Sequence, residues 1–173
     1  MLKCIRKLNC LKTRNSVDLQ SKDEIWAKAT KDLEHITYKD TIPFIIPILY
    51  GKVIKVYDGD TITIAAVLPI INNNKLYRFS VRLSGIDSPE IKGHTQREKI
   101  AAIVARDALH KLIFGKVIEL RNNANEKYGR LLADIYLPTA DGSGNLIHIN
   151  KWMLDNKYAI PYNGGTKQQF TQP

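Results

Sequence analysis

The feature that most restricts the fold is a run of three strand-like segments between residues 48 and 86. These segments are YGKVIKVY (50–57), DTITIAAVL (60–68) and LYRFSVRLSGI (76–86). Apolar and polar residues alternate along them and β-branched residues are frequent, which is typical of half-buried strands. The tight DGD turn and an Asn-rich loop separate the segments. The pattern therefore predicts three consecutive strands.

The second half of the chain predicts a helix, two strands and another helix. A helix is expected at about 97–114, with Thr95 as its cap and Gly115 as its stop. KVIELRN (116–122) and RLLADIYL (130–137) resemble strands, and INKWMLDNK (149–157) resembles a short helix. This order predicts a β-barrel with α-helices, namely a five-stranded, partly open barrel of the OB-fold type with two helices. Such barrels often bind nucleic acid, but architecture alone establishes no activity.

Three regions are expected along the chain. An N-terminal extension (1–42) is predicted to contain an amphipathic helix at about 21–35, because Ser21 and Glu24 form a capping-box pattern before an apolar repeat. The barrel domain is expected over 43–165, and a flexible tail over 166–173. The first fourteen residues are basic and contain no acid. They fit a disordered terminus, or a targeting or membrane-surface segment, so the localisation stays open.

Charge and cysteine content limit the partners and the chemistry. The net charge of +9 and the pI near 9.5 favour polyanionic partners such as DNA or RNA, although many soluble proteins are basic. Cys4 and Cys10 both lie in the extension, so the barrel domain has no disulfide and no thiolate metal site. No apolar stretch approaches the length of a membrane helix. We expect a monomer, and no feature indicates a protein partner.

Two acidic segments gain significance when they are considered together. Alone, DGDT (58–61) and RLSGIDSPE (82–90) are ordinary turns, in which Gly59 allows a sharp bend. In a barrel, the end of the first strand can lie beside the end of the third and bring Asp60 near Asp87. Two adjacent carboxylates repel and need a cation between them. Oxygen ligands favour calcium or magnesium over zinc.

Two arginines supply positive charge near these acids. Arg82 begins the second segment, and Arg130 ends the YGR turn of a third segment, EKYGRLLA (126–133). Each guanidinium can fork onto phosphate oxygens, although a solvated charge or a salt bridge is an equally ordinary role. Two forks and a divalent cation would clamp a phosphodiester whose charge grows during attack by water.

These motifs resemble those of the staphylococcal nuclease (thermonuclease-like) family. DGDT, R-x-x-x-x-D-x-P-E and K-Y-G-R occur in the family's order, and the likeness runs from about Tyr50 to Tyr162. The resemblance implies a five-stranded OB barrel. It also implies calcium-dependent hydrolysis of DNA and RNA, with single-stranded substrate preferred and 3′-phosphate ends produced.

The resemblance also implies a role for each matched residue. Calcium would be bound directly by Asp60, Asp87 and the backbone carbonyl of Ser88, and through water by Asp58. The catalytic residues would be Glu90 at the attacking water, with Arg82 and Arg130 at the scissile phosphate. Further substrate contacts would come from Lys127, Tyr128 and Tyr162.

The sequence departs from the family pattern at Ser88 and at Ile160. Ser88 replaces the usual Thr, a mild change if only its carbonyl binds metal. Ile160 stands where the first of two binding-site tyrosines is expected, which leaves Tyr162 alone for base stacking. A catalytically weak nucleic-acid-binding or scaffold barrel is the main alternative, and a protein-interaction module is another. The presence of all the acids and both arginines favours catalysis.

Overall fold

The computed structural model describes residues 21–71, 74–93 and 95–165, which form two compact units divided between residues 43 and 44. The basic segment at 1–14, with both cysteines, and the predicted tail at 166–173 lie outside the described residues.

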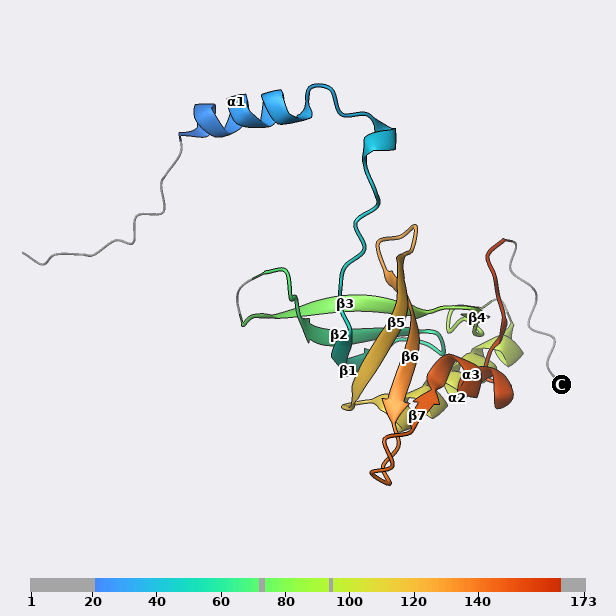
Figure 1. Cartoon of the computed structure of the whole chain (residues 1–173). Helices are drawn as coiled ribbons and strands as arrows, with labels where there is room; N and C mark the ends of the chain where they lie inside the picture. The colour runs from blue at the N-terminus through green and yellow to red at the C-terminus, as the bar shows by residue number, and fades with distance from the viewer. Residues whose placement is uncertain (1–20, 72–73, 94, 166–173) are drawn as a thin grey trace, which may run out of the picture. The chain divides into compact units, whose positions relative to one another are not determined.

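The first unit contains the predicted amphipathic helix, α1 (Lys22–Leu33), followed by a 3₁₀ turn at Tyr38–Asp40 (Figure 1). Ser21 caps α1. Its hydroxyl accepts from the Glu24 N–H at 3.2 Å, and its own N–H donates to the Glu24 carboxylate at 2.9 Å. This capping box satisfies helix-end donors that would otherwise face water. α1 buries no residue, so local capping is its main support.

The second unit is the five-stranded barrel that the sequence predicts. Its strands are β1 (Tyr50–Val56), β2 (Thr61–Val67), β3 (Leu76–Leu83), β5 (Val117–Asn125) and β6 (Leu131–Pro138). Antiparallel pairing joins β1 to β2, β2 to β3, β1 to β5 and β5 to β6. Parallel pairing of β3 with β6 closes the barrel, which Figure 1 shows as a curved sheet. The predicted OB-fold class is therefore confirmed.

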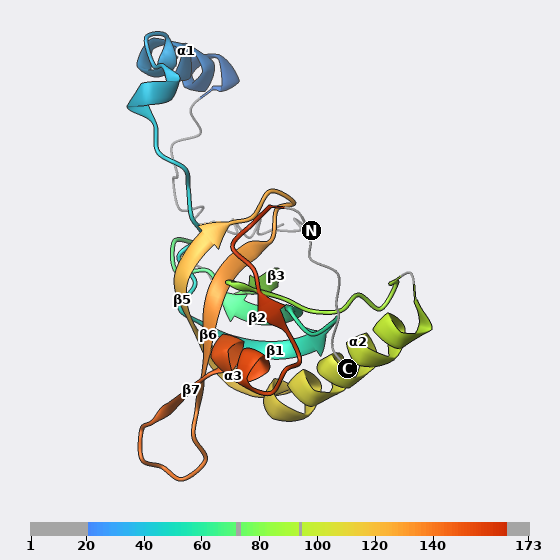
Figure 2. The same cartoon turned by 90° about the vertical axis from the view of Figure 1, so that its right-hand side faces the viewer.

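Two helices and three short strands complete this unit (Figure 2). The helices are α2 (Gln96–Ile113) and α3 (Ile149–Asp155), close to their predicted positions. The short strands are β4 (Ile86–Asp87), β7 (Leu146–His148) and β8 (Ile160–Pro161), none of which the sequence pattern predicted. β4 pairs with β8, which brings a C-terminal segment against the end of the third strand. In the described residues, no helix is both long enough and apolar enough to cross a membrane.

The core follows from the period-two pattern. Along β6, buried and partly exposed residues alternate, and the buried ones, Leu131, Ala133, Ile135 and Leu137, face the barrel interior. Burying a branched aliphatic side chain contributes about 1.5–3 kcal/mol, so this face stabilises the barrel. The same alternation leaves polar side chains at the strand ends, where the acidic segments lie.

One buried polar residue joins α3 to the barrel. Asn150 is 3% exposed, and its amide nitrogen donates to the carbonyls of Ser84 at 2.8 Å and Ala133 at 3.2 Å. Its amide oxygen accepts from the Ile135 N–H at 2.9 Å. Asn150 thereby satisfies backbone groups that water cannot reach.

We expect Asn150→Ala to lower the free energy of unfolding by about 2–4 kcal/mol, because it leaves several buried backbone groups without partners. Urea denaturation followed by circular dichroism would measure this. Asn145→Ala, at an exposed position near β7, is the matched control and should change the stability by less than about 0.5 kcal/mol. Equal effects of the two substitutions would contradict this role for Asn150.

Candidate active site

The three motif segments, 58–61, 82–90 and 126–133, meet at one cavity of about 450 Å³. All the predicted site residues except Asp87 line it: Asp58, Asp60, Arg82, Ser88, Glu90, Lys127, Tyr128, Arg130 and Tyr162. They come from the β1–β2 turn, the end of β3 and the segment after it, the β5–β6 turn and the segment after β8. The cavity is therefore built by barrel corners that are distant in sequence.

Gly59, in the β1–β2 turn, is required for a reason other than the predicted one. The sequence predicts a glycine that permits a sharp bend, but Gly59 is not among the residues with positive φ. A Cβ added to Gly59 would lie 2.8 Å from the Ser88 Cβ and 3.0 Å from the Ala105 Cβ. Real Cβ atoms do not approach so closely, so a glycine is needed here because the turn packs against its neighbours.

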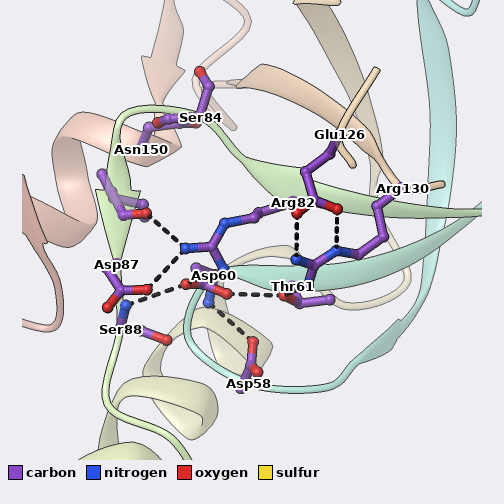
Figure 3. Close-up of polar contacts among 11 residues, drawn as sticks. Asp58, Asp60, Thr61, Arg82, Ser84, Asp87, Ser88, Glu126, Arg130 and Asn150 are labelled. Atoms are coloured by element: carbon purple, nitrogen blue, oxygen red, sulfur yellow. Dashed lines mark hydrogen bonds and ion pairs between the residues drawn. The ribbon is translucent and has the colours of Figure 1, made fainter. Parts of the chain in front are cut away.

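Arg82 pairs with both buried aspartates (Figure 3). Its Nη1 is 2.8 Å from Asp60 Oδ2, and its Nη2 is 2.8 Å from Asp87 Oδ1. The carboxylate-bearing residues are only 3% and 4% exposed. The predicted convergence of Asp60 and Asp87 thus occurs around a guanidinium. Asp60 and Asp87 contact the two terminal nitrogens of the same guanidinium, and Asp87 does not line the cavity.

Asp60 is more difficult to ionise than a free aspartate despite this ion pair. Burial, and then the charge of Asp58, raise the pKa of Asp60 to about 7, although Arg82 and the Thr61 hydroxyl favour ionisation. Two further hydrogen bonds reach its carboxylate, from the Thr61 hydroxyl at 2.8 Å and from the Ser88 N–H at 3.2 Å. A carboxylate in this setting would be stabilised by an additional cation.

The donor atoms around Asp60 fit a hard divalent cation. Carboxylate oxygens of Asp58 and Asp60 and the backbone of Ser88 meet at the cavity, and oxygen ligands suit calcium or magnesium. In the part of the chain that the structure describes, no group of three or more His, Cys, Asp or Glu side chains is arranged as a metal cluster. The described residues therefore fit a site with few protein ligands and several waters better than a zinc cage.

A second guanidinium, that of Arg130, is held beside the first. Its Nε and Nη2 donate to the Glu126 carboxylate at 3.1 and 3.2 Å, and its Nη1 donates to Thr61 Oγ1 at 3.3 Å. Because the Thr61 hydroxyl donates in turn to Asp60, one hydrogen-bonded chain connects Arg130 to the acidic centre (Figure 3). Glu126 was not predicted as a site residue, although its i,i+4 spacing from Arg130 is a recognisable signal.

The remaining predicted residues lie around the two guanidiniums. Tyr128 is 73% exposed, with Lys127 Nζ at 4.8 Å and Arg130 Cζ at 6.0 Å from its ring centroid. The Tyr162 ring centroid is 5.8 Å from Arg82 Cζ. Glu90 is exposed at the cavity. Tyr57, Ile91 and Lys92 also line the cavity but were not predicted.

Comparison with known proteins supports the resemblance. Residues 80–172 match the family described as staphylococcal nuclease homologue. An "uncharacterized endonuclease" of Escherichia coli is 30% identical over 112 residues, which cover 65% of this chain and 60% of that protein. The uncharacterized protein MJ1439 of Methanocaldococcus jannaschii is 32% identical over 133 residues, covering 65% and 59%. The chain thus spans about three fifths of the length of these relatives.

A plant protein shows a shorter match. The staphylococcal-like nuclease CAN1 of Arabidopsis thaliana is 41% identical over 59 residues, which cover 34% of this chain and 16% of that protein.

The raised pKa of Asp60 predicts a stability that depends on pH. The folded protein holds this proton up to about pH 7, whereas the unfolded chain releases it near 3.8. The folded state therefore binds more protons between these values, so the free energy of unfolding should fall as pH rises from about 4 to 7. Asp60→Asn should flatten that dependence. Thermal melts in chelator at several pH values would measure it.

Asp155→Asn, at an exposed position of α3, is the control for that experiment and should keep the slope of the wild type. If Asp60→Asn and the wild type show the same slope, the assignment of the raised pKa to Asp60 is wrong.

Proposed function

Because the chain belongs to the staphylococcal nuclease family, we propose that it is a calcium-dependent phosphodiesterase that hydrolyses DNA or RNA, with single strands preferred. One observation carries the proposal: a single cavity collects an acidic turn, two guanidiniums and exposed tyrosines. The net charge of +9 would attract a polyanionic strand to this cavity.

The acidic turn is the proposed metal site. As the resemblance implies, Asp60, Asp87 and the Ser88 carbonyl would hold the calcium, or magnesium, with Asp58 acting through water, although Asp87 does not line the cavity and its Oδ1 pairs with Arg82. When bound, the cation supplies Lewis-acid polarisation of the phosphate and lowers the pKa of a coordinated water. Burial, and then the charge of Asp58, raise the pKa of Asp60, and a cation bound beside this carboxylate would favour its ionised form.

The two arginines are the proposed phosphate clamp. Glu126 takes the Nε–Nη2 edge of Arg130, so the Nη1–Nη2 edge is the one that can fork onto phosphate oxygens. Arg82 lies close to the same place, at the metal site. Both positive charges are fixed before substrate arrives, so they can stabilise the growing negative charge of the transition state without reorganising.

Glu90 is the proposed acceptor of the water proton. It lines the cavity together with Asp60 and both arginines, within the space that a phosphodiester would occupy. Water oxygen would bond to phosphorus as the bond to the 5′ oxygen breaks, which leaves a 3′-phosphate end and a 5′ oxygen that takes a proton from solvent water to become a hydroxyl. Glu90 would take the water proton or hold the water in line.

Preference for single strands would come from the aromatic side chains. Tyr128 and Tyr162 offer ring faces at the cavity, and Lys127 lies over the ring of Tyr128. Unpaired bases can stack on such rings, whereas bases within a duplex cannot.

A binding barrel with weak catalysis is the second candidate. Arg82 is engaged by both Asp60 and Asp87. In a binding-only barrel, that arrangement would be a structural ion pair with no catalytic purpose.

A degradation assay on heat-denatured DNA tests the proposed reaction. We expect activity with calcium, none with chelator, and a loss of about 100-fold or more in Glu90→Gln, because general-base catalysis contributes factors of this size. Glu119→Gln, on β5 and paired with Arg121, is the control and should keep its activity. Degradation without calcium, or equal in Glu90→Gln, would refute the mechanism; binding without degradation would favour the second candidate.

The clamp predicts that Arg130 cannot be replaced by lysine. Arg130→Lys keeps the charge but loses the fork, so kcat/KM should fall by about 10–1,000-fold. Arg121→Lys is the matched control, because Arg121 also pairs with a glutamate but does not line the cavity. Comparable losses in both variants would show that general folding defects, rather than the fork, are responsible.

A further inference from the structure

A second hollow adjoins the candidate active site and shares one side chain with it. Its volume is about 460 Å³, and its lining residues are Lys55, Val56, Tyr57, Arg106, Asp107 and His110. Tyr57 also lines the catalytic cavity. The two hollows are therefore neighbours on the barrel surface, and the ring of Tyr57 stands at their boundary.

Tyr57 has the properties of a stacking platform. It is 50% exposed, although it directly precedes the acidic turn. Its N–H donates to the Thr61 carbonyl at 2.9 Å, so the turn that places Asp58 and Asp60 also fixes its backbone. Lys55 Nζ is 5.6 Å from its ring centroid. An exposed aromatic ring on a fixed backbone, beside a cation, is suited to a base on the ring and a phosphate at the ammonium group.

The far wall of this hollow comes from α2 and is polar and basic. Arg106 pairs with its neighbour Asp107, with Nε and Nη2 at 2.9 and 2.7 Å from Asp107 Oδ1. The His110 ring is stacked on Phe114, with centroids 4.3 Å apart and the planes 14° from parallel. Lys55 and Arg106 thus face the hollow from two elements, which gives it the cationic character that a phosphate backbone requires.

From this geometry we propose that the hollow is a second subsite for the nucleic acid strand, in which a nucleotide flanking the cleaved bond stacks on Tyr57 and its phosphate lies near Lys55. This inference rests on the proposed function for the identity of the strand. The occupant is a continuation of the substrate itself. Val56 is the one aliphatic residue among those that line the hollow, and the others are charged or aromatic, so an apolar peptide does not fit it.

If the subsite exists, the contribution of Tyr57 to binding affinity should depend on the length of the substrate. A dinucleotide fills the catalytic cavity alone, whereas an oligothymidylate of eight residues also reaches the hollow. Tyr57→Ala in the full chain should weaken binding of the octamer about tenfold more than that of the dinucleotide, since one base loses its stacking partner. Tyr57→Phe should restore binding of the octamer. Fluorescence anisotropy of labelled octamer in chelator, with unlabelled dinucleotide as competitor, gives both affinities without cleavage.

Two controls separate stacking from general damage. Tyr50→Ala removes another exposed tyrosine, 60% exposed at the opposite end of β1, and should leave both affinities unchanged. An octamer that is abasic at the flanking positions should bind the wild type and Tyr57→Ala equally. Lys55→Ala should lower the slope of log K against log salt by about one, as expected for the loss of one phosphate contact.

The outcomes distinguish this inference from the proposed function. If the dinucleotide and the octamer lose the same affinity, or if Tyr57→Phe behaves as Tyr57→Ala, the subsite does not exist. If the wild type cleaves nothing but the length-dependent loss is observed, the phosphodiesterase is refuted while the subsite stands. If it cleaves DNA and Tyr57→Ala changes no length dependence, only the subsite fails.

Discussion

The ion pairs of Arg82 with Asp60 and Asp87 are the interaction on which the rest of the site depends. Thr61 lies opposite Arg82 in the β2–β3 register, so the barrel ladder itself sets Arg82 beside the acidic turn. Asp87 reaches the same guanidinium from β4, which pairs with β8. A shift of one residue in either pairing would turn the side chains to the opposite face and separate the charges. The pairing register of the barrel strands therefore also determines which charges meet in the site.

The ion pairs of Arg82 also explain how a protein with a positive net charge can contain buried acidic residues. The net charge of +9 belongs to the chain as a whole and favours polyanionic partners, whereas Asp60 is a single acidic residue that is buried and paired with Arg82. Arg82 favours the ionised form of Asp60, but burial and then the charge of Asp58 raise its pKa. An acidic residue that is difficult to ionise therefore lies in the cavity of a protein whose net charge is positive.

The sequence predicted the barrel well because apolar and polar residues largely alternate along its strands and its long helix has clear end signals. It did not predict β4 and β8, because strands of two residues have no periodicity and exist only through their tertiary pairing. The order of the motifs predicted that Asp60 and Asp87 converge, but it did not predict that both pair with the guanidinium of Arg82. The sequence also did not reveal why position 59 needs a glycine. The reason is the close approach of Ser88 and Ala105, which are distant in sequence. Three-dimensional packing, rather than local propensity, decides each of these features.

The aromatic residues around the cavity show how the chain can compensate for its departure from the family pattern. Ile160 replaces one expected tyrosine, and it lies in β8 opposite Asp87, where its backbone supports the acidic centre. Tyr57 supplies a ring at another edge of the same cavity, beside the acidic turn, where a base can reach it from the adjoining hollow. Stacking energy depends on an exposed, fixed ring rather than on which strand carries it. Moving the ring from β8 to the end of β1 would therefore keep the affinity for single strands while changing which nucleotide of the strand is held.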